Sequence, residues 1–261
     1  MKQRRAMTSD HARHVKIKGH LNEQHFAEAI GGEVNAGSQS DKKDVIDKNH
    51  RAHSVKSGKW WQIFLYGEER LRTNTIFRGI GNLADIMLQC INTYPDNYEK
   101  YNKNKKTVKE ELRPHMRELC EELKKTNILK AFLDKALFDG GNADYLSIHN
   151  GPSGTQKENK HFHIFYKDDV TKVLIEDIRV INSKARQKSQ TSDQKVVFPS
   201  KYFKKQIGEI EDRHDSNTHY RQIKFRLNGF LVFELLKNKI SDSKEIKSNV
   251  TTYGKAIKLF N

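Results

Sequence analysis

Residues 19 to 66 constrain the fold most, because a helical pattern gives way there to closely spaced strands. Apolar residues recur at helical spacing after Gly19, namely Leu21, Phe26, Ala27 and Ile30. The glycine pair at 31 and 32 then predicts the end of a short amphipathic helix. We expect strands at residues 33 to 36, 44 to 47 and 53 to 56, separated by a polar loop and a turn.

Polar side chains on these elements are predicted to converge. Ser54 and Lys56 are two residues apart on one strand, so they project to the same face. Asp44 shares that face if its strand pairs antiparallel with theirs. Glu23 lies one helical turn before the apolar residues of the preceding helix, at the edge of its apolar face. The pattern therefore brings together acidic, hydroxyl and amino groups.

These groups suit metal-assisted attack on a phosphodiester bond. A hard cation such as Mg2+ binds to one or two carboxylates and completes its coordination with waters and phosphate oxygens. The bound metal would lower the pKa of a water molecule. Lys56 would orient that water or stabilise the charge on the phosphorane.

The same residues resemble the PD-(D/E)xK nuclease core of many type II restriction endonucleases. Asp44 matches the first aspartate of the motif, and Ser54-Val55-Lys56 matches the (D/E)xK triplet. Glu23, in Gly19-x-x-x-Glu23, matches the helix acid that those enzymes often carry. The resemblance covers a minor part of the 261 residues. Lys43 replaces the proline of the motif, and Ser54 replaces its second carboxylate.

The resemblance implies a type II restriction enzyme, which is a Mg2+-dependent, sequence-specific endonuclease acting on double-stranded DNA. Asp44 would be the main metal ligand and Glu23 an auxiliary acid. Ser54 would be a weak or water-mediated ligand, and Lys56 would position or activate water. The reserve acids are Glu33 and Asp47. Cleavage of both strands usually requires two active sites, so a homodimer is expected.

The charge balance also suits a polyanionic partner. Lys and Arg number 48 against 33 Asp and Glu, which gives a formal net charge of +15.

Cys90 and Cys120 lie among apolar residues of predicted helices, which indicates reduced core thiols in a cytoplasmic protein. No apolar run approaches the ~20 residues of a membrane span, and no apolar region typical of a signal peptide follows the basic N-terminus.

The rest of the chain predicts a helical segment at 76 to 139 and a β-rich part at 144 to 240. Within and after this part we expect a strand at 175 to 181, a short helix at 202 to 210 and an edge strand at 256 to 260. The loop at 182 to 192 is dense in groups that bind phosphates and base edges. The candidate DNA-binding residues are Asn182, Lys184, Arg186, Gln187, Lys188 and, from the basic face of a later strand, Arg221.

We therefore expect an α/β protein with a central mixed β-sheet flanked by helices. A basic N-terminal arm at residues 1 to 18 precedes a single nuclease domain at 19 to 261. In that domain a restriction-endonuclease-like catalytic core at 19 to 66 is followed by the added helical segment and by the β-rich DNA-recognition part.

Other functions stay open. A non-catalytic DNA- or RNA-binding regulator would use residues 41 to 56 as a charged hairpin, and the missing second carboxylate favours it. A structure-specific repair or recombination nuclease is a second alternative. His161 and His163 share a strand face but lack a third ligand at metal-binding spacing. The zinc knuckles of HNH nucleases, the GxxxxGK[ST] phosphate loop and the GxSxG elbow are absent from the sequence.

Overall fold

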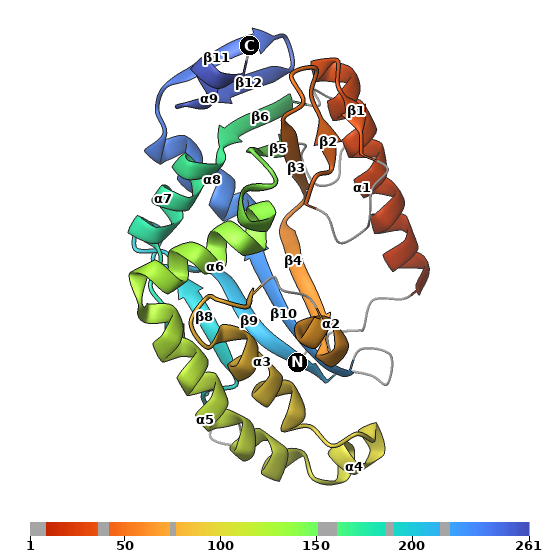
Figure 1. Cartoon of the computed structure of the whole chain (residues 1–261), viewed down its shortest axis with the longest axis vertical. Coiled ribbons are helices and arrows are strands. Elements are labelled where there is room, and N and C mark those ends of the chain that lie inside the picture. The colour runs from red at the N-terminus through yellow and green to blue at the C-terminus, as the bar shows by residue number, and fades with distance from the viewer. Residues whose placement is uncertain are drawn as a thin grey trace.

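The computed structural model describes residues 9–35, 42–73, 77–150, 161–185, 191–214 and 220–260. Over these residues the chain is an α/β protein built on a mixed sheet and a second, antiparallel sheet, with helices packed around both (Figure 1). The predicted mixed β-sheet flanked by helices is therefore confirmed.

The strands and helices have the following bounds. In spatial order, the seven-stranded sheet contains β1 (Glu33–Val34), β2 (Val45–Ile46), β3 (Ala52–Ser57), β5 (Tyr145–Asn150), β6 (His161–Tyr166), β12 (Val250–Tyr253) and β11 (Ser243–Lys247). The five-stranded sheet contains β4 (Trp60–Gly67), β10 (Tyr220–Asn228), β9 (Gln206–His214), β8 (Lys195–Pro199) and β7 (Ile181–Asn182). The helices are α1 (Ser9–Ile30), α2 (Glu68–Thr73), α3 (Leu83–Asn92), α4 (Tyr98–Lys103), α5 (Lys105–Lys124), α6 (Thr126–Phe138), α7 (Lys167–Asp177), α8 (Gly229–Lys239) and α9 (Ala256–Leu259), with a 3-10 turn at Asp139–Gly141.

The seven-stranded sheet is held against α1 by a small apolar core. β1, β2 and β3 form an antiparallel meander, and β3 then pairs in parallel with β5. Phe26, Ala27 and Ile30 of α1 are buried in one cluster with Val45 of β2 and Val55 of β3. Because Val45 and Val55 pack against α1, the helix lies along the strand that directly follows Asp44 and the strand that carries Lys56.

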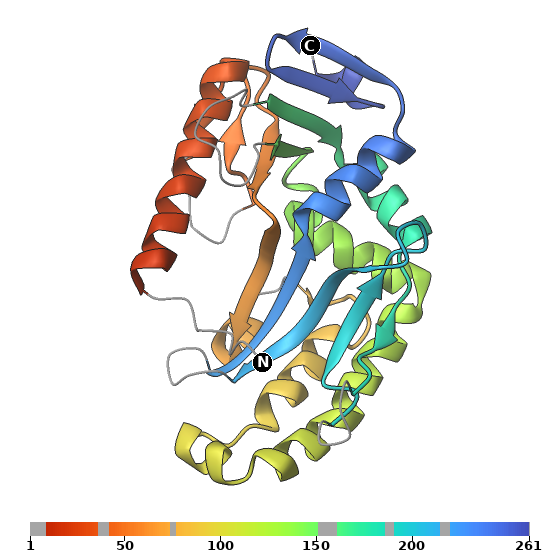
Figure 2. The same ribbon diagram turned by 180° about the vertical axis from the view of Figure 1, so that it is seen from behind.

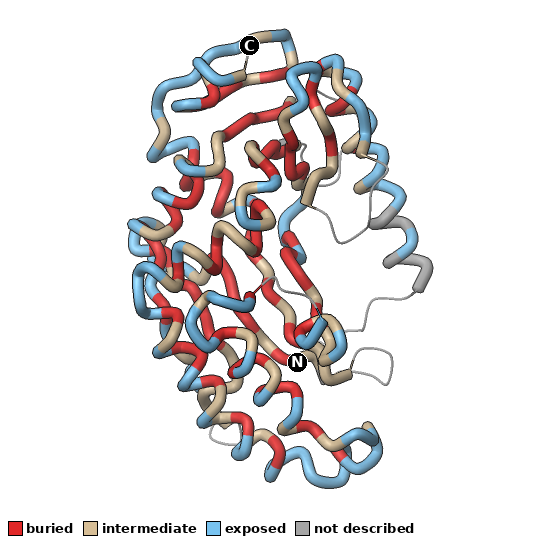
Figure 3. The backbone as a smooth tube through the Cα atoms, viewed as in Figure 1, coloured by how far each residue is buried: buried red, intermediate tan, exposed pale blue. Residues whose placement is uncertain are grey.

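Among the residues that the structure describes, the helices cover one face of the five-stranded sheet. A turn at Gly58, which has a φ of 79°, joins β3 of the first sheet to β4 of the second. Ile223, Phe225 and Leu227 of β10 alternate into the main core, where helices α3, α5 and α6 pack on them. The view from behind shows β10, β9 and β8 in front of these helices, with no helix over them (Figure 2). Along β10, buried residues alternate with partly exposed ones, as expected for a strand with one face in the core (Figure 3).

Cys90 of α3 and Cys120 of α5 are buried free thiols in this core, as predicted. Among the helices of the described residues, none combines the length and the apolar character needed to cross a membrane.

The first helix is longer than the glycines predict. It begins at Ser9, so residues 9 to 18 of the predicted basic arm belong to α1 and Gly19 lies inside it. Leu21, expected on the apolar face, is 45% exposed, whereas Phe26 is fully buried. The apolar contact with the sheet is therefore made by the C-terminal half of the helix.

Three further predictions of secondary structure are wrong. Residues 175 to 177 continue helix α7, because Val170, Val173 and Leu174 are buried at helical spacing, and the strand begins only at Ile181. Residues 206 to 210 belong to β9, in which a bulge inserts Ile207 and imitates a helical repeat. Residues 256 to 259 form α9 after a turn at Gly254, and the strands of this region are β11 and β12 instead.

Candidate active site

Asp44 and Lys56 are in direct contact. The register pairs Val45 with His53, which places Asp44 at the start of the hairpin formed by β2 and β3. The Lys56 ammonium donates to Asp44 Oδ2 at 3.1 Å, and the backbone N–H of Val55 donates to the same oxygen at 2.7 Å. The two side chains are only 17% and 20% exposed, so this contact lies at the surface but is shielded from much of the solvent.

Glu23 approaches this pair from α1. The helix is tied to β3 by the amide of Asn22, which donates to the Ser57 hydroxyl at 2.9 Å. The pKa of the Glu23 carboxyl is raised above its usual value of 4.5, first by burial and then by the negative charge of Asp44, while the charges of His20 and Lys56 act in the opposite direction. Burial and the charge of Asp44 together therefore outweigh the contact with His20, whose Nδ1 lies 3.1 Å from Glu23 Oε2, and the charge of Lys56.

Lys42 completes the cluster, although sequence analysis did not select it. Its ammonium donates to the backbone carbonyl of Ile63 in β4. Burial, followed by the charge of Lys56, lowers the pKa of Lys42 to about 8, while the Asp44 carboxylate opposes that decrease. The sequence gives no signal for this role, because the position depends on a carbonyl of the other sheet. We call Glu23, Lys42, Asp44 and Lys56 the carboxylate corner.

The hydroxyl of Ser54 is not part of this contact. Ser54 is fully buried in β3, opposite Leu146 of β5. Within the described part of the chain, its Oγ has no hydrogen-bond partner. The structure therefore brings Asp44, Lys56 and Glu23 together, whereas the role of Ser54 as a ligand stays a prediction without a contact to these groups.

The donor set of the corner suits a hard cation with few protein ligands. Over the described ranges, no group of three or more His, Cys, Asp or Glu side chains is arranged to hold a metal ion. Asp44 and Glu23 offer two carboxylates, which is the number that Mg2+ takes when waters and phosphate oxygens fill its other positions. A zinc site with three or four protein ligands does not fit these residues.

The reserve acids lie outside the corner. Glu33 is an exposed residue of β1, opposite Ile46. Asp47 accepts from the backbone N–H groups of Asn49 and Arg51 at 2.8 and 3.0 Å. Burial raises the pKa of Asp47, but the nearby His53 ring, 3.5 Å away, and the hydrogen bonds from these backbone groups outweigh burial and lower it. Asp47 is therefore a structural carboxylate of the turn between β2 and β3.

The contacts of His53 have the chemical composition of a hydrolase triad but not its accessibility. His53 Nδ1 lies 2.9 Å from the hydroxyl of Ser147, and its Nε2 lies 3.5 Å from Asp47 Oδ2. His53 and Ser147 are completely buried, and Asp47 is 4% exposed. A nucleophilic serine must reach its substrate. We therefore interpret this triplet as a buried polar link between β2, β3 and β5.

Most of the predicted DNA-binding residues that the structure describes have partners within the chain. Asn182 donates to the backbone carbonyl of Met116 at 2.9 Å. Arg221 forms ion pairs with Glu68, at 2.9 Å, and with Asp96. Lys184 is exposed. The remaining three, Arg186, Gln187 and Lys188, lie outside the described residues.

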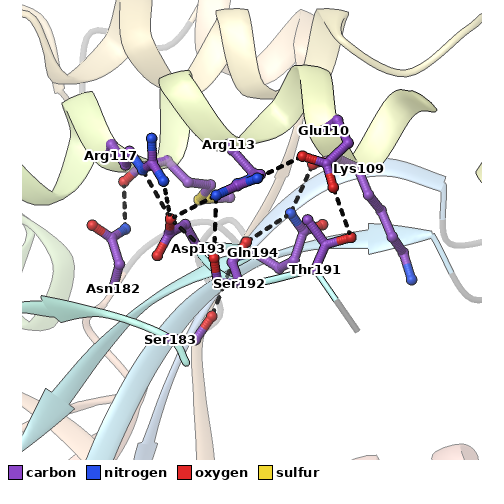
Figure 4. A network of polar contacts seen from close by, with 11 residues as sticks. Lys109, Glu110, Arg113, Arg117, Asn182, Ser183, Thr191, Ser192, Asp193 and Gln194 are labelled. Atoms are coloured by element: carbon purple, nitrogen blue, oxygen red, sulfur yellow. Dashed lines mark hydrogen bonds and ion pairs between the residues drawn. The ribbon is translucent and has the colours of Figure 1, made fainter. Parts of the chain in front are cut away.

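Both ends of the predicted recognition loop are bound to α5 (Figure 4). Arg117 of the helix pairs with Asp193 at 2.7 Å, and Gln194 donates to the carbonyl of Lys109 at 2.8 Å. β7, where the loop begins, is the edge strand opposite β4, with three strands between them. Four strand spacings amount to about 19 Å. The loop therefore starts at the far edge of the sheet from the carboxylate corner.

A hollow of about 520 Å³ opens elsewhere, beside the end of α6. Its lining includes Arg78, Lys135, Phe138 and Lys167, but no residue of the carboxylate corner. Lys167 is already engaged by Asp144, at 3.4 Å. In the corner, the side chains of Lys56 and Asp44 are partly exposed to solvent.

Comparisons of this chain with protein-family models, with curated proteins and with solved structures found no match.

Proposed function

We propose that this protein is a Mg2+-dependent nuclease that hydrolyses phosphodiester bonds of DNA at the carboxylate corner. The observation that carries the proposal is the 3.1 Å contact between Lys56 and Asp44, with the Glu23 carboxyl close enough for the charge of Asp44 to raise its pKa. Two carboxylates that repel each other beside a lysine form a binding site for a divalent cation and for the phosphate it accompanies.

Each group of the corner has a chemical role in this proposal. Asp44 and Glu23 would hold Mg2+, which supplies Lewis-acid activation of water and of the phosphate when it is bound. Lys56 lies within hydrogen-bond distance of Asp44 and would donate to a phosphate oxygen or orient the attacking water. Lys42, with a pKa of about 8, adds a second positive charge near neutral pH and would help to neutralise the phosphate.

The order of the elements supports the finer form of the proposal. A helix with an acid, an aspartate directly before a strand, and a strand with a lysine follow one another in the order of the PD-(D/E)xK core, and the three elements pack together. The net charge of +15 favours a nucleic-acid partner. In its finer form, the enzyme is a sequence-specific type II endonuclease that cleaves double-stranded DNA as a homodimer.

The experiment compares wild type, Lys56→Ala and Lys167→Ala on long duplex DNA with Mg2+ and with EDTA. The control is matched, because Lys167 also contacts an aspartate, Asp144, and is similarly shielded, with 23% of its side chain exposed. We expect discrete fragments with wild type and Lys167→Ala in Mg2+, and none with Lys56→Ala or in EDTA. Binding without cleavage by wild type would leave a non-catalytic DNA-binding protein. Cleavage that survives in Lys56→Ala would place the active site elsewhere.

A further inference from the structure

The strand that follows the corner carries an exposed tryptophan. Trp60 and Trp61 are adjacent in β4, so their side chains project to opposite faces of the sheet. Trp61 is 3% exposed and packs in the main core, whereas Trp60 is 42% exposed. Its side chain lies on the face of the five-stranded sheet that no helix covers in Figure 2, together with that of Gln62.

The indole of Trp60 is held in place from one side. The guanidinium carbon of Arg226 lies 4.7 Å from the centre of its ring. Arg226 is itself fixed, because its Nε donates to Glu209 at 2.6 Å and Glu209 is only 5% exposed. A flat aromatic surface is thus preorganised and still accessible to solvent, as nucleobase stacking requires.

Trp60 lies close to the carboxylate corner along the chain. Trp60 is the fourth residue after Lys56, so their Cα atoms are at most about 14 Å apart, even in a fully extended chain. That upper limit corresponds to at most about four nucleotides at the ~3.4 Å rise of one strand of duplex DNA. A second exposed aromatic residue, Phe230, which is 58% exposed, follows Asn228, the cross-strand partner of Trp60.

We propose that Trp60 is a stacking platform for an unpaired nucleobase of the DNA strand that the carboxylate corner cleaves. The inference rests on the proposed nuclease function in its coarser form, hydrolysis of DNA at the carboxylate corner. In place of the fully paired duplex of the finer form, it names DNA with a single-stranded or extrahelical base within a few nucleotides of the scissile phosphate. A base inside an intact duplex is stacked on its neighbours and cannot offer its face to the indole.

Trp60 also provides the signal that tests the proposal. Since the chain has only two tryptophans, Trp61→Phe leaves Trp60 as the single indole. We would titrate this variant, in EDTA so that no cleavage occurs, with a single-stranded oligonucleotide and with the fully paired duplex of the same sequence. We expect the single strand to quench the Trp60 emission and the duplex to leave it unchanged. If Trp61→Phe does not fold, the difference between the emission of wild type and that of Trp60→Phe gives the same signal.

Affinity gives a second readout with a matched control. Stacking contributes about 1–3 kcal/mol per base, so Trp60→Ala should weaken binding of the single strand by about 5- to 150-fold. Tyr202 is the matched control, because it is also an exposed aromatic residue next to a cation. It is 51% exposed, and the Lys239 ammonium lies 5.4 Å from its ring centre. Tyr202→Ala should leave the affinity unchanged.

The outcomes separate this inference from the nuclease proposal. Equal quenching by single strand and duplex, no quenching by either, or equal loss of affinity in both alanine variants would overturn the stacking platform, whether or not wild type cleaves DNA in Mg2+. Selective quenching in a protein that never cleaves DNA would support the platform and would contradict the nuclease function.

Discussion

Two regions of this protein place carboxylates beside lysines and arginines, and they differ in how completely the charges are compensated. On the uncovered face of the five-stranded sheet, Glu209 and Glu211 alternate with cations in an ion-pair ladder formed with Lys195, Lys224 and Arg226. Burial raises the pKa of Glu211, but the charges of Lys195 and Lys224 outweigh burial and lower it to about 2. In the carboxylate corner, by contrast, the pKa of Glu23 is raised.

The difference indicates which region is structural and which can bind a ligand. In the ladder each carboxylate already has two cationic partners, so a further cation would gain little. In the corner, burial and the charge of Asp44 together disfavour the ionised form of Glu23, and a divalent cation bound between the two carboxylates would offset both. Similar residue types thus stabilise the fold in one place and prepare a binding site in the other.

The sharpest contrast is expected in catalysis. Asp44→Asn removes a charge from the corner, so we expect the rate of Mg2+-dependent DNA cleavage to fall by about 100-fold or more. Glu211→Gln removes a charge from the ladder and should leave the rate close to that of wild type. Rates are measured on duplex and single-stranded DNA, with circular dichroism to verify folding. Equal losses in both variants would remove the functional distinction between the two regions.

The same two variants should rank in the opposite order in stability. Glu211→Gln leaves Lys195 and Lys224 without their shared partner, which should lower the free energy of unfolding by about 1–3 kcal/mol. Asp44→Asn should change it by less than about 1 kcal/mol, because the contact with Lys56 is partly exposed and its loss also relieves repulsion on Glu23. Urea unfolding curves test this order, and a larger loss in Asp44→Asn would reverse the assignment.

The pH dependence of stability should have opposite signs in the two regions. The folded-state pKa of Glu211 is depressed, so its contribution is present above about pH 4.5 and is lost as the pH falls towards 2. The folded-state pKa of Glu23 is raised, so its ionisation becomes a cost as the pH rises above 4.5. In EDTA, Glu23→Gln should therefore gain stability relative to wild type as the pH rises to neutrality. A constant difference between the two would contradict the raised pKa.

The smallest expected effect concerns Lys42. Its ammonium should lose its proton as the pH rises through about 8, which removes a positive charge from the corner. Wild-type cleavage should therefore decline modestly above pH 8, whereas Lys42→Arg, which stays charged, should not show that decline. Identical alkaline limbs in the pH profiles of the two proteins would exclude Lys42 from the active site.

The sequence predicts the core of the corner because its determinants are local. Glu23 is placed by helical spacing, and Asp44 and Lys56 belong to one hairpin whose turn is short, so the pairing could be anticipated. Ser54 and Lys42 are different. Ser54 is enclosed by β5, almost a hundred residues later in the chain, and Lys42 is fixed by the carbonyl of Ile63 in the other sheet. The spacing of residues around Ser54 and Lys42 in the sequence predicts neither the contact with β5 nor the contact with Ile63.

The segments whose secondary structure was predicted wrongly also depend on contacts with distant parts of the chain. In β9 a bulge at Ile207 puts two buried isoleucines, Ile207 and Ile210, three residues apart, which is the spacing of a helix. β12 is a strand because it pairs in parallel with β6, a contact between distant parts of the chain. The exposure of Trp60 likewise depends on which face of the second sheet the helices cover.

Direct measurement of Mg2+ binding tests the central claim, because it requires neither a known DNA sequence nor a cleavable substrate. Calorimetric titration of wild type, Asp44→Asn and Glu211→Gln with Mg2+ should show binding to wild type and Glu211→Gln, and its loss in Asp44→Asn. Binding that persists in Asp44→Asn, or its absence from wild type, would contradict the assignment of the carboxylate corner as a metal site.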